Sequence, residues 1–516
     1  MPASIRDKAA GLIVLRLGSN MVPPRSAEDD AEVVRALLDR HPFGGLILFD
    51  GRWPETRQTL RDLQRKSDRG LLVMTDMERG LGQQVAGATV FPHLRAFGEL
   101  GDGDEAAARE FARIGAQEAL ACGVHVAFAP VADVSRNPQN PIISTRAFGE
   151  DTQRVERLVR VYIEAAREAG LLTTAKHFPG HGNTHEDSHA VTPVVHDSFE
   201  ELSTHDLPPF RAAVDAGVDL MMTAHVSYPA LDVSGSPATR SHPILHDLLR
   251  NWLGFDGAVI TDSLHMAGIH DAGRTEADVA LDMLNAGVDL LLDLRNPEAL
   301  VEGVARAVEE GRLEEATLDR SLVRAERLRK RLRARFGENV FADPSLAFSP
   351  DVVGSEEHQA VARRIARDAI KVLEGTVPDI HTGEGLLALL IDPATTDTTI
   401  ETSFENALAE HFPEAACRRV GGDAAPSDDV RSAIQTAERL LVAFVVKPAA
   451  WHRFGLSDEQ RAFVQDLIDQ KPTTLAALGD PRALNGFEGA EAQLCTYSDV
   501  PASRVALIEF LASSRT

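Results

Sequence analysis

The chain is poor in cysteine and in long apolar runs. Its three cysteines, Cys122, Cys417 and Cys495, are scattered without paired spacing, which argues against a disulfide framework and against a cysteine-ligated metal. No run approaches the roughly 20 apolar residues of a membrane helix, so we expect no membrane span. Residues 1–16 carry charges and only a short apolar run. We therefore expect no signal peptide or lipid anchor, and a reduced, cytoplasmic protein.

Positive charge is also scarce. The 53 lysines and arginines are outnumbered by 78 acidic residues, and the formal net charge is −25. A nucleic-acid-binding face needs clustered lysine and arginine to displace counterions, so this balance disfavours nucleic acid as a partner. Only seven of the 53 are lysines, a bias that fits either high genomic GC content or adaptation to salt or heat. The acidic residues are spread along the chain, as on a solvated surface.

The length of 516 residues is enough for two domains, each with its own core. Up to residue 294, short apolar runs alternate with longer segments of helical period, which is the pattern of repeated βα units. Eight runs are candidate strands, and eight is the number that closes a (β/α)8 barrel. The candidate strands are 12–17, 45–49, 71–75, 124–129, 172–176, 220–224, 258–261 and 288–292.

A second domain is expected after the barrel. A strongly charged helix over 317–335 runs into a stretch rich in glycine, asparagine, aspartate and proline, which is typical of a linker. Beyond it, four or five short apolar runs alternate with helical segments. The sequence therefore predicts an α/β protein: a TIM-type barrel over 1–335 that carries catalysis, a linker over 336–352, and a smaller open α/β sandwich over 353–516.

The segment 176–189 concentrates chemistry. It reads KHFPGHGNTHEDSH and follows a short apolar run. Pro179, Gly180 and Gly182 favour a shaped loop over a helix. A strand that ends in such a loop of titratable groups has the active-site geometry of a parallel barrel. The four-residue spacing of the histidines would suit zinc only on a helix, so we expect no metal.

Retaining glycoside hydrolysis needs one group that attacks the sugar and a second that protonates the leaving oxygen. Asp262 could supply the first, and the pair Asp187 and His189 could supply the second. Asp262 directly follows the apolar run 258–261, where a carboxylate either acts as a nucleophile or caps the next helix. Asp187 and His189 are two residues apart, so in an extended loop they point the same way and the carboxylate supports the charged imidazole. This pair would serve as acid and then as base.

Five ordered motifs resemble the β-N-acetylhexosaminidase branch of glycoside hydrolase family 3. They are KHFPGHG with DSH at 187–189, TDSLHM at 261–266, FAPVAD at 128–133, the segment 140–149 from NP to RAFG, and MTAH at 222–225. The resemblance implies that Asp262 is the nucleophile of a covalent glycosyl-enzyme and that His189 is the acid/base, held by Asp187. It also implies that further side chains bind the N-acetylglucosamine. These are Asp76, Arg146, Lys176, His177, and His225, which either contacts the sugar or orients its neighbours.

The resemblance implies an exo-acting, cofactor-independent β-N-acetylglucosaminidase that acts on muropeptides or chitooligosaccharides. A phosphorylase with the same residues is the alternative, because phosphate can open the glycosyl-enzyme in place of water and an imidazole does not repel that anion. A non-catalytic sugar-binding module is a third alternative, although neither the nucleophile nor the acid is missing. The natural aglycone stays open, and so does the oligomeric state, for which a homodimer is one option.

Overall fold

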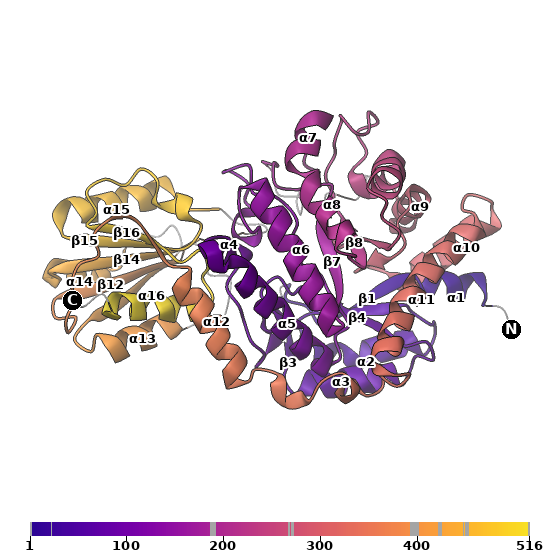
Figure 1. Ribbon diagram of the computed structural model, residues 1–516, viewed down its shortest axis with the longest axis horizontal. Helices are drawn as coiled ribbons and strands as arrows, with labels where there is room; N and C mark the ends of the chain where they lie inside the picture. The colour runs from indigo at the N-terminus through magenta and orange to yellow at the C-terminus, as the bar shows by residue number, and fades with distance from the viewer. Residues whose placement is uncertain are drawn as a thin grey trace. The chain divides into compact units, whose positions relative to one another are not determined.

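The protein is described from a computed structural model (Figure 1). The described residues are 3–21, 23–185, 192–266, 269, 273–392, 402–421, 426–446, 448 and 454–513. Among them, no helix is both long enough and apolar enough to cross a membrane.

An eight-stranded parallel sheet forms the N-terminal part of the chain and confirms the expected TIM-type barrel. The strand order is β10-β1-β2-β4-β6-β7-β8-β9, and a parallel bridge between Ile260 and Leu290 links the two ends of that order. Each predicted apolar run contains or overlaps one strand. The strands are β1 (Ile13–Leu17), β2 (Gly45–Leu48), β4 (Leu72–Thr75), β6 (Val126–Ala127), β7 (Leu172–Phe178), β8 (Leu220–Thr223), β9 (Ala258–Thr261) and β10 (Leu291–Leu292).

Helices between the strands form the outer layer of the barrel (Figure 1). Helix α6 shows how the sequence defines them: the Asp151 side chain caps its first turn, Gly170 ends it in the left-handed conformation, and one face is buried. The helices are α1 (Ile5–Ala10), α2 (Ala27–Leu38), α3 (Glu55–Gln64), α5 (Asp104–Cys122), α6 (Thr152–Ala169), α7 (Phe199–His205), α8 (Leu207–Asp215), a π-helical segment (Pro243–Trp252), α9 (Glu276–Ala286), α10 (Pro297–Glu309) and α11 (Glu315–Phe336).

A six-stranded sheet forms the C-terminal part of the chain, in the order β11-β16-β15-β14-β12-β13. All neighbours are parallel except β11, which runs antiparallel to β16. The four apolar runs expected here coincide with β12, β14, β15 and β16, whereas the two edge strands were not expected. The strands are β11 (Lys371–Gly375), β12 (Leu386–Asp392), β13 (Ala416–Gly421), β14 (Arg439–Val446), β15 (Thr473–Gly479) and β16 (Ala492–Cys495).

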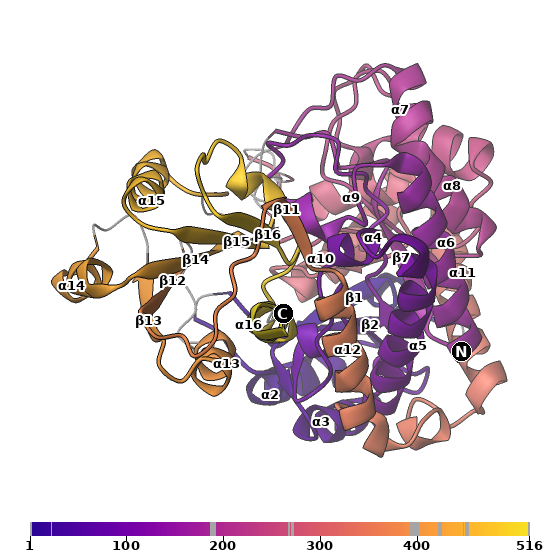
Figure 2. The same ribbon diagram turned by 60° about the vertical axis from the view of Figure 1, so that its left-hand side comes forward.

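Both faces of this sheet are covered, as the expected α/β sandwich requires (Figure 2). Along β14, Val442 packs into one apolar cluster and its neighbour Leu441 into the other. Such runs, apolar at every position, are typical of central parallel strands. The helices of this region are α12 (Glu356–Asp368), α13 (Ser403–His411), α14 (Asp428–Thr436), α15 (Asp458–Gln470) and α16 (Pro501–Ser513).

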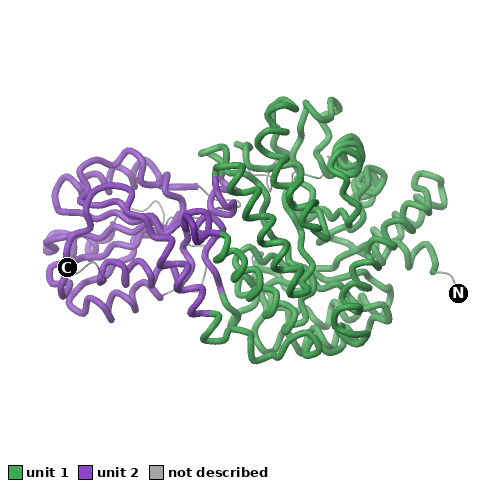
Figure 3. The backbone as a smooth tube through the Cα atoms, in the orientation of Figure 1, with its two compact units in different colours: residues 1–89, 105–140, 150–358 green, residues 90–104, 141–149, 359–516 purple. Residues whose placement is uncertain are grey.

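The chain divides into two compact units (Figure 3). The first comprises residues 1–89, 105–140 and 150–358, and contains the barrel. The second comprises residues 90–104, 141–149 and 359–516. Two short segments from within the barrel sequence thus belong to the second unit, one of which includes helix α4 (Leu94–Gly98). The sequence division at 335 and 353 did not anticipate these two segments.

Candidate active site

Polar side chains follow the strands of the barrel at their carboxyl ends. Asp76 follows β4, Lys176 and His177 lie near the end of β7, His225 follows β8, and Asp262 follows β9. The carboxyl ends of parallel barrel strands meet on one face, where the active sites of such barrels lie. The contacts and charges below connect these residues into one site.

Lys176 is held between two carboxylates. Its Nζ lies 2.7 Å from an oxygen of Asp76 and 2.7 Å from an oxygen of Glu78. Lys176 is only 2% exposed, whereas 28% of the Asp76 side chain is exposed. The lysine is therefore fixed beneath a carboxylate that solvent or a ligand can reach. Glu78, which the sequence analysis did not single out, completes this ion pair.

Asp133 organises the start of the loop that follows β7. Its buried carboxylate accepts hydrogen bonds from His177 Nδ1 at 2.7 Å, from His177 N at 3.2 Å and from His181 N at 2.6 Å. Burial alone would raise the pKa of this acid, but His177 and His181 outweigh it and hold the pKa below its ordinary value. The charged carboxylate therefore fixes the orientation of the His177 ring. From the sequence, Asp133 could be placed a few residues after an apolar run and within the FAPVAD motif, but its partners could not be predicted.

The loop itself is tightly packed as far as residue 184. A Cβ atom on Gly182 would lie 1.7 Å from the carbonyl oxygen of Val134, so this position requires glycine. Asn140 Nδ2 donates to the His181 carbonyl at 2.8 Å, and Tyr228 donates to the Gly180 carbonyl at 2.6 Å. These contacts confirm a shaped loop in place of a helix.

Asp262 is half-buried, and its carboxylate accepts a hydrogen bond of 2.7 Å from the backbone amide of Ser263. Burial alone would raise the pKa of this acid. The charges of His177, His225 and Lys176 outweigh burial and lower the pKa to about 2. Asp262 is therefore ionised at neutral pH and lies close enough to these three side chains to interact with their charges.

His225 is buried at the end of β8. Its Nδ1 lies 2.7 Å from the hydroxyl of Thr239, and its Nε2 lies 3.4 Å from the Ser263 carbonyl oxygen. The imidazole therefore connects the loop after β8 with the backbone beside Asp262.

An ion pair beside Asp262 was not expected from the sequence. Arg16 on β1 donates two hydrogen bonds to Asp293, at 2.6 and 2.5 Å, and the Ser263 hydroxyl donates to the same carboxylate at 2.6 Å. These contacts hold Ser263, the residue after Asp262, close to Asp293 at the end of β10. The sequence does mark Arg16 as unusual, because it is the one charged residue within the apolar run 12–17.

The contacts described above do not test the roles of three predicted site residues. Arg146 belongs to the segment 141–149 of the second unit, where its guanidinium donates to the carbonyl of Ile142 at 3.2 Å. Asp187 and His189 lie within 186–191, outside the described residues. Their roles stay predictions.

Two histidines of the loop, His177 and His181, make contacts with protein groups. His177 Nδ1 bonds to Asp133, and His181 Nδ1 lies 2.9 Å from the Thr184 hydroxyl. Within the described part of the chain, the one group of side chains with metal-ligand spacing lies elsewhere, on the surface of the barrel. It consists of His242, His246 and Asp247.

Comparison with known proteins identifies the family. The model of the glycosyl hydrolase family 3 N-terminal domain matches residues 4–328, so the chain belongs to this family and is a glycoside hydrolase. It is 29% identical over 502 residues to β-hexosaminidase A of Pseudoalteromonas piscicida, covering 90% of this chain and 80% of that protein. It is 36% identical over 293 residues to a β-hexosaminidase of Stenotrophomonas maltophilia, covering 55% of this chain and 85% of that protein.

The fold has solved relatives along its whole length. The structure of a glycoside hydrolase family 3 β-N-acetylglucosaminidase from Paenibacillus sp. aligns with a TM-score of 0.84 at 28% identity. The alignment covers 99% of this chain and 97% of that one. The barrel and the sandwich therefore occur together in a family relative of similar length.

Proposed function

We propose that the protein is a retaining, exo-acting β-N-acetylglucosaminidase. The observation that carries this proposal is Asp262, an ionised carboxylate at the end of β9 with two histidines and a lysine around it, in a chain of glycoside hydrolase family 3. A charged, partly exposed carboxylate at this position suits a nucleophile better than a helix cap, because its low pKa keeps it ionised for attack.

The first chemical step forms a glycosyl-enzyme. An Asp262 oxygen attacks the anomeric carbon while the bond to the leaving oxygen breaks, and His189 donates a proton to that oxygen. In the second step, water loses a proton to His189 and displaces Asp262 from the sugar. Asp187, two residues before His189, supports the charged imidazole in the first step.

The sugar hydroxyls are bound next to the nucleophile. Asp76 offers a partly exposed carboxylate that accepts hydrogen bonds from hydroxyl groups, while Lys176 and His177 are held rigidly by Glu78 and Asp133. Rigid polar groups favour the transition state because they need no reorganisation as charge develops. We assign the same role to Arg146 on the strength of its motif alone.

The proposed sugar is supported by the relatives, whereas the proposed aglycones come from the family resemblance of the sequence. The β-hexosaminidases and the β-N-acetylglucosaminidase that resemble this chain support N-acetylglucosamine as the sugar. Muropeptides and chitooligosaccharides both carry terminal β-linked N-acetylglucosamine, and both are proposed substrates.

The test is release of nitrophenol from the nitrophenyl β-N-acetylglucosaminide, in buffer with and without phosphate, with the sugar product identified by mass. Free N-acetylglucosamine in both buffers is the expected result. Asp262→Asn should lower the rate by at least about 10³-fold. Asp215→Asn, which removes an exposed acid at the end of α8, should retain wild-type activity.

Two outcomes would contradict the proposal. A sugar 1-phosphate with faster turnover in phosphate would make the protein a phosphorylase that uses the same nucleophile. Unimpaired turnover by Asp262→Asn would remove Asp262 from the mechanism.

A further inference from the structure

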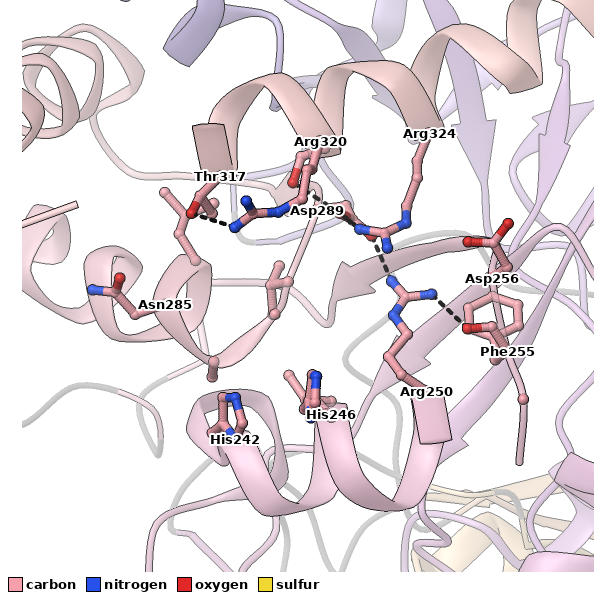
Figure 4. Close-up of a pocket in the computed structure, with 17 residues that line it drawn as sticks. His242, His246, Arg250, Phe255, Asp256, Asn285, Asp289, Thr317, Arg320 and Arg324 are labelled. Atoms are coloured by element: carbon pink, nitrogen blue, oxygen red, sulfur yellow. Dashed lines mark hydrogen bonds and ion pairs between the residues drawn. The ribbon is translucent and has the colours of Figure 1, made fainter. Parts of the chain in front are cut away.

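A cavity of about 550 Å³ lies at the opposite end of the barrel from the site described above (Figure 4). Its walls are the π-helical segment 243–252, the loops that precede β9 and β10, and the first turns of α11. Because these loops enter the strands at their amino ends, the cavity is remote from Asp262. Ligand pockets for small molecules have volumes of this order.

Positive charge gathers in this cavity, although the chain as a whole carries a net charge of −25. Figure 4 shows Arg250 on one wall and Arg320 and Arg324 on the opposite wall, along α11. Two acids, Asp256 and Asp289, also line the cavity. The net charge of the cavity therefore depends on which arginines these two carboxylates pair with.

Asp289 is already saturated with donors. Its buried carboxylate accepts hydrogen bonds from Arg250 at 2.8 Å, Arg324 at 3.0 Å, the Ser321 hydroxyl at 2.8 Å and the Val259 amide at 2.9 Å. One negative charge thus faces two arginines. Burial lowers the pKa of Arg250, Asp289 opposes this, and the charge of Arg324 lowers the pKa further.

Arg320 adds a charge that neither acid neutralises. Asp256 pairs with Arg327 at 2.8 Å, and Arg327 does not line the cavity. Arg320 is exposed and donates to the hydroxyl of Thr317 at 2.9 Å, and no carboxylate among the described residues forms an ion pair with it. A guanidinium in this state retains most of its donors for a ligand.

Further hydrogen-bond donors surround the same space. The amide of Asn285 and the rings of His242 and His246 line the cavity, and the two rings stack with centroids 4.7 Å apart. In Figure 4 the two histidines lie across the cavity from Arg320. The paired N–H donors of a planar guanidinium group match the geometry of phosphate oxygens. Imidazole and amide groups can donate to the same oxygens.

We propose that this cavity binds a small phosphorylated metabolite, with Arg320 as its principal ligand and with His246 and Asn285 as further donors. The volume exceeds that of phosphate alone and suits a phosphate monoester with a short polar body. The reaction proposed for Asp262 uses none of these residues, so this site is independent of that proposal.

The test is calorimetric titration of the full-length protein at low salt with glycerol 3-phosphate, with glycerol and glycerate as neutral and carboxylate comparators. We expect saturable binding of glycerol 3-phosphate that is clearly tighter than binding of either comparator.

Arg320→Gln should weaken the binding of glycerol 3-phosphate about tenfold or more, because a hydrogen bond between charged groups is lost. His246→Gln should weaken it by a smaller factor. Lys330→Gln removes a charge from the exposed face of the same helix, outside the cavity, and should leave the affinity within about twofold.

Each contrary outcome overturns the proposal. Absence of saturable binding would do so, and so would equal weakening by Arg320→Gln and Lys330→Gln, which would indicate general attraction of anions. Equal affinity for glycerate would exclude a phosphate-specific site. Loss of binding on addition of a chelator would show that the group formed by His242, His246 and Asp247 holds a metal ion that binds the anion in place of Arg320.

Discussion

At the scale of the residue, the charge state of Asp262 is set by its neighbours. An aspartate has an ordinary pKa near 3.8, and the surrounding positive charges lower it to about 2 in this protein. A carboxylate with a lowered pKa stays ionised until the pH falls through that lower value. Between pH 4 and 7 the charge of Asp262 is therefore constant, so the proposed mechanism predicts that its ionisation does not limit the rate in that range.

This gives a prediction for the pH profile. With a dinitrophenyl glycoside, whose leaving group needs little protonation, kcat/KM should stay flat from about pH 7 down to about pH 4, because only the ionised nucleophile is required. The measurement is the initial rate across this range, restricted to pH values at which the protein remains folded by circular dichroism. An acidic limb with an apparent pKa of 4 to 5 in the folded protein would contradict the environment assigned to Asp262.

Some site residues could be identified from the sequence because they lie at the end of an apolar run or within a motif. Asp76, Lys176, His177, His225 and Asp262 could be placed because each adjoins an apolar run. The contacts of Glu78 and Asp133 could not be predicted, because they depend on pairs that the closed barrel brings together. Asp133, for instance, bonds to residues 44 and 48 positions further along the chain.

At the scale of the element, the loop after β7 depends on one glycine. Gly182→Ala should lower kcat by about 10²-fold, because the new Cβ displaces either the loop or the backbone at Val134 and so shifts groups near the nucleophile. It should also lower the free energy of unfolding by about 1–3 kcal/mol through overpacking. Steady-state kinetics and urea denaturation measure the two effects.

Gly115→Ala is the matched control for this variant. Gly115 lies inside helix α5, and the nearest atom to its added Cβ would be Met77 Cε at an ordinary 3.7 Å. Alanine favours the helix over glycine, so this variant should keep its activity and unfold no more easily than the wild type. Equal losses in the two variants would show that the contact with Val134 does not matter.

Edge strands were harder to predict than central ones. The central strands of the sandwich, such as β12 and β14, are apolar at nearly every position because both faces are covered. Edge strand β11 is mostly exposed, and edge strand β13 carries Arg418 and Arg419. Charged residues protect sheet edges from pairing with other chains, but they also remove the apolar pattern by which a strand is identified.

At the scale of the whole molecule, the barrel was predictable because its pattern repeats. Eight apolar runs that alternate with helical segments predict the strand number, and the motifs at their ends predict the catalytic face. The assignment of 90–104 and 141–149 to the second unit was not predictable, because both segments lie between barrel elements in the sequence. That assignment depends on contacts with residues far along the chain, such as the hydrogen bond of 2.5 Å between Ser144 and Asp480.

The central claim is that this glycoside hydrolase works through a covalent intermediate on Asp262. The most direct test is to incubate the protein with a fluorinated N-acetylglucosaminyl analogue that slows release of the intermediate, and then to map the label by peptide mass spectrometry. We predict one added sugar, on the peptide that contains Asp262, and no label on Asp262→Asn. A label on another residue, or full turnover of substrate by Asp262→Asn, would contradict the account.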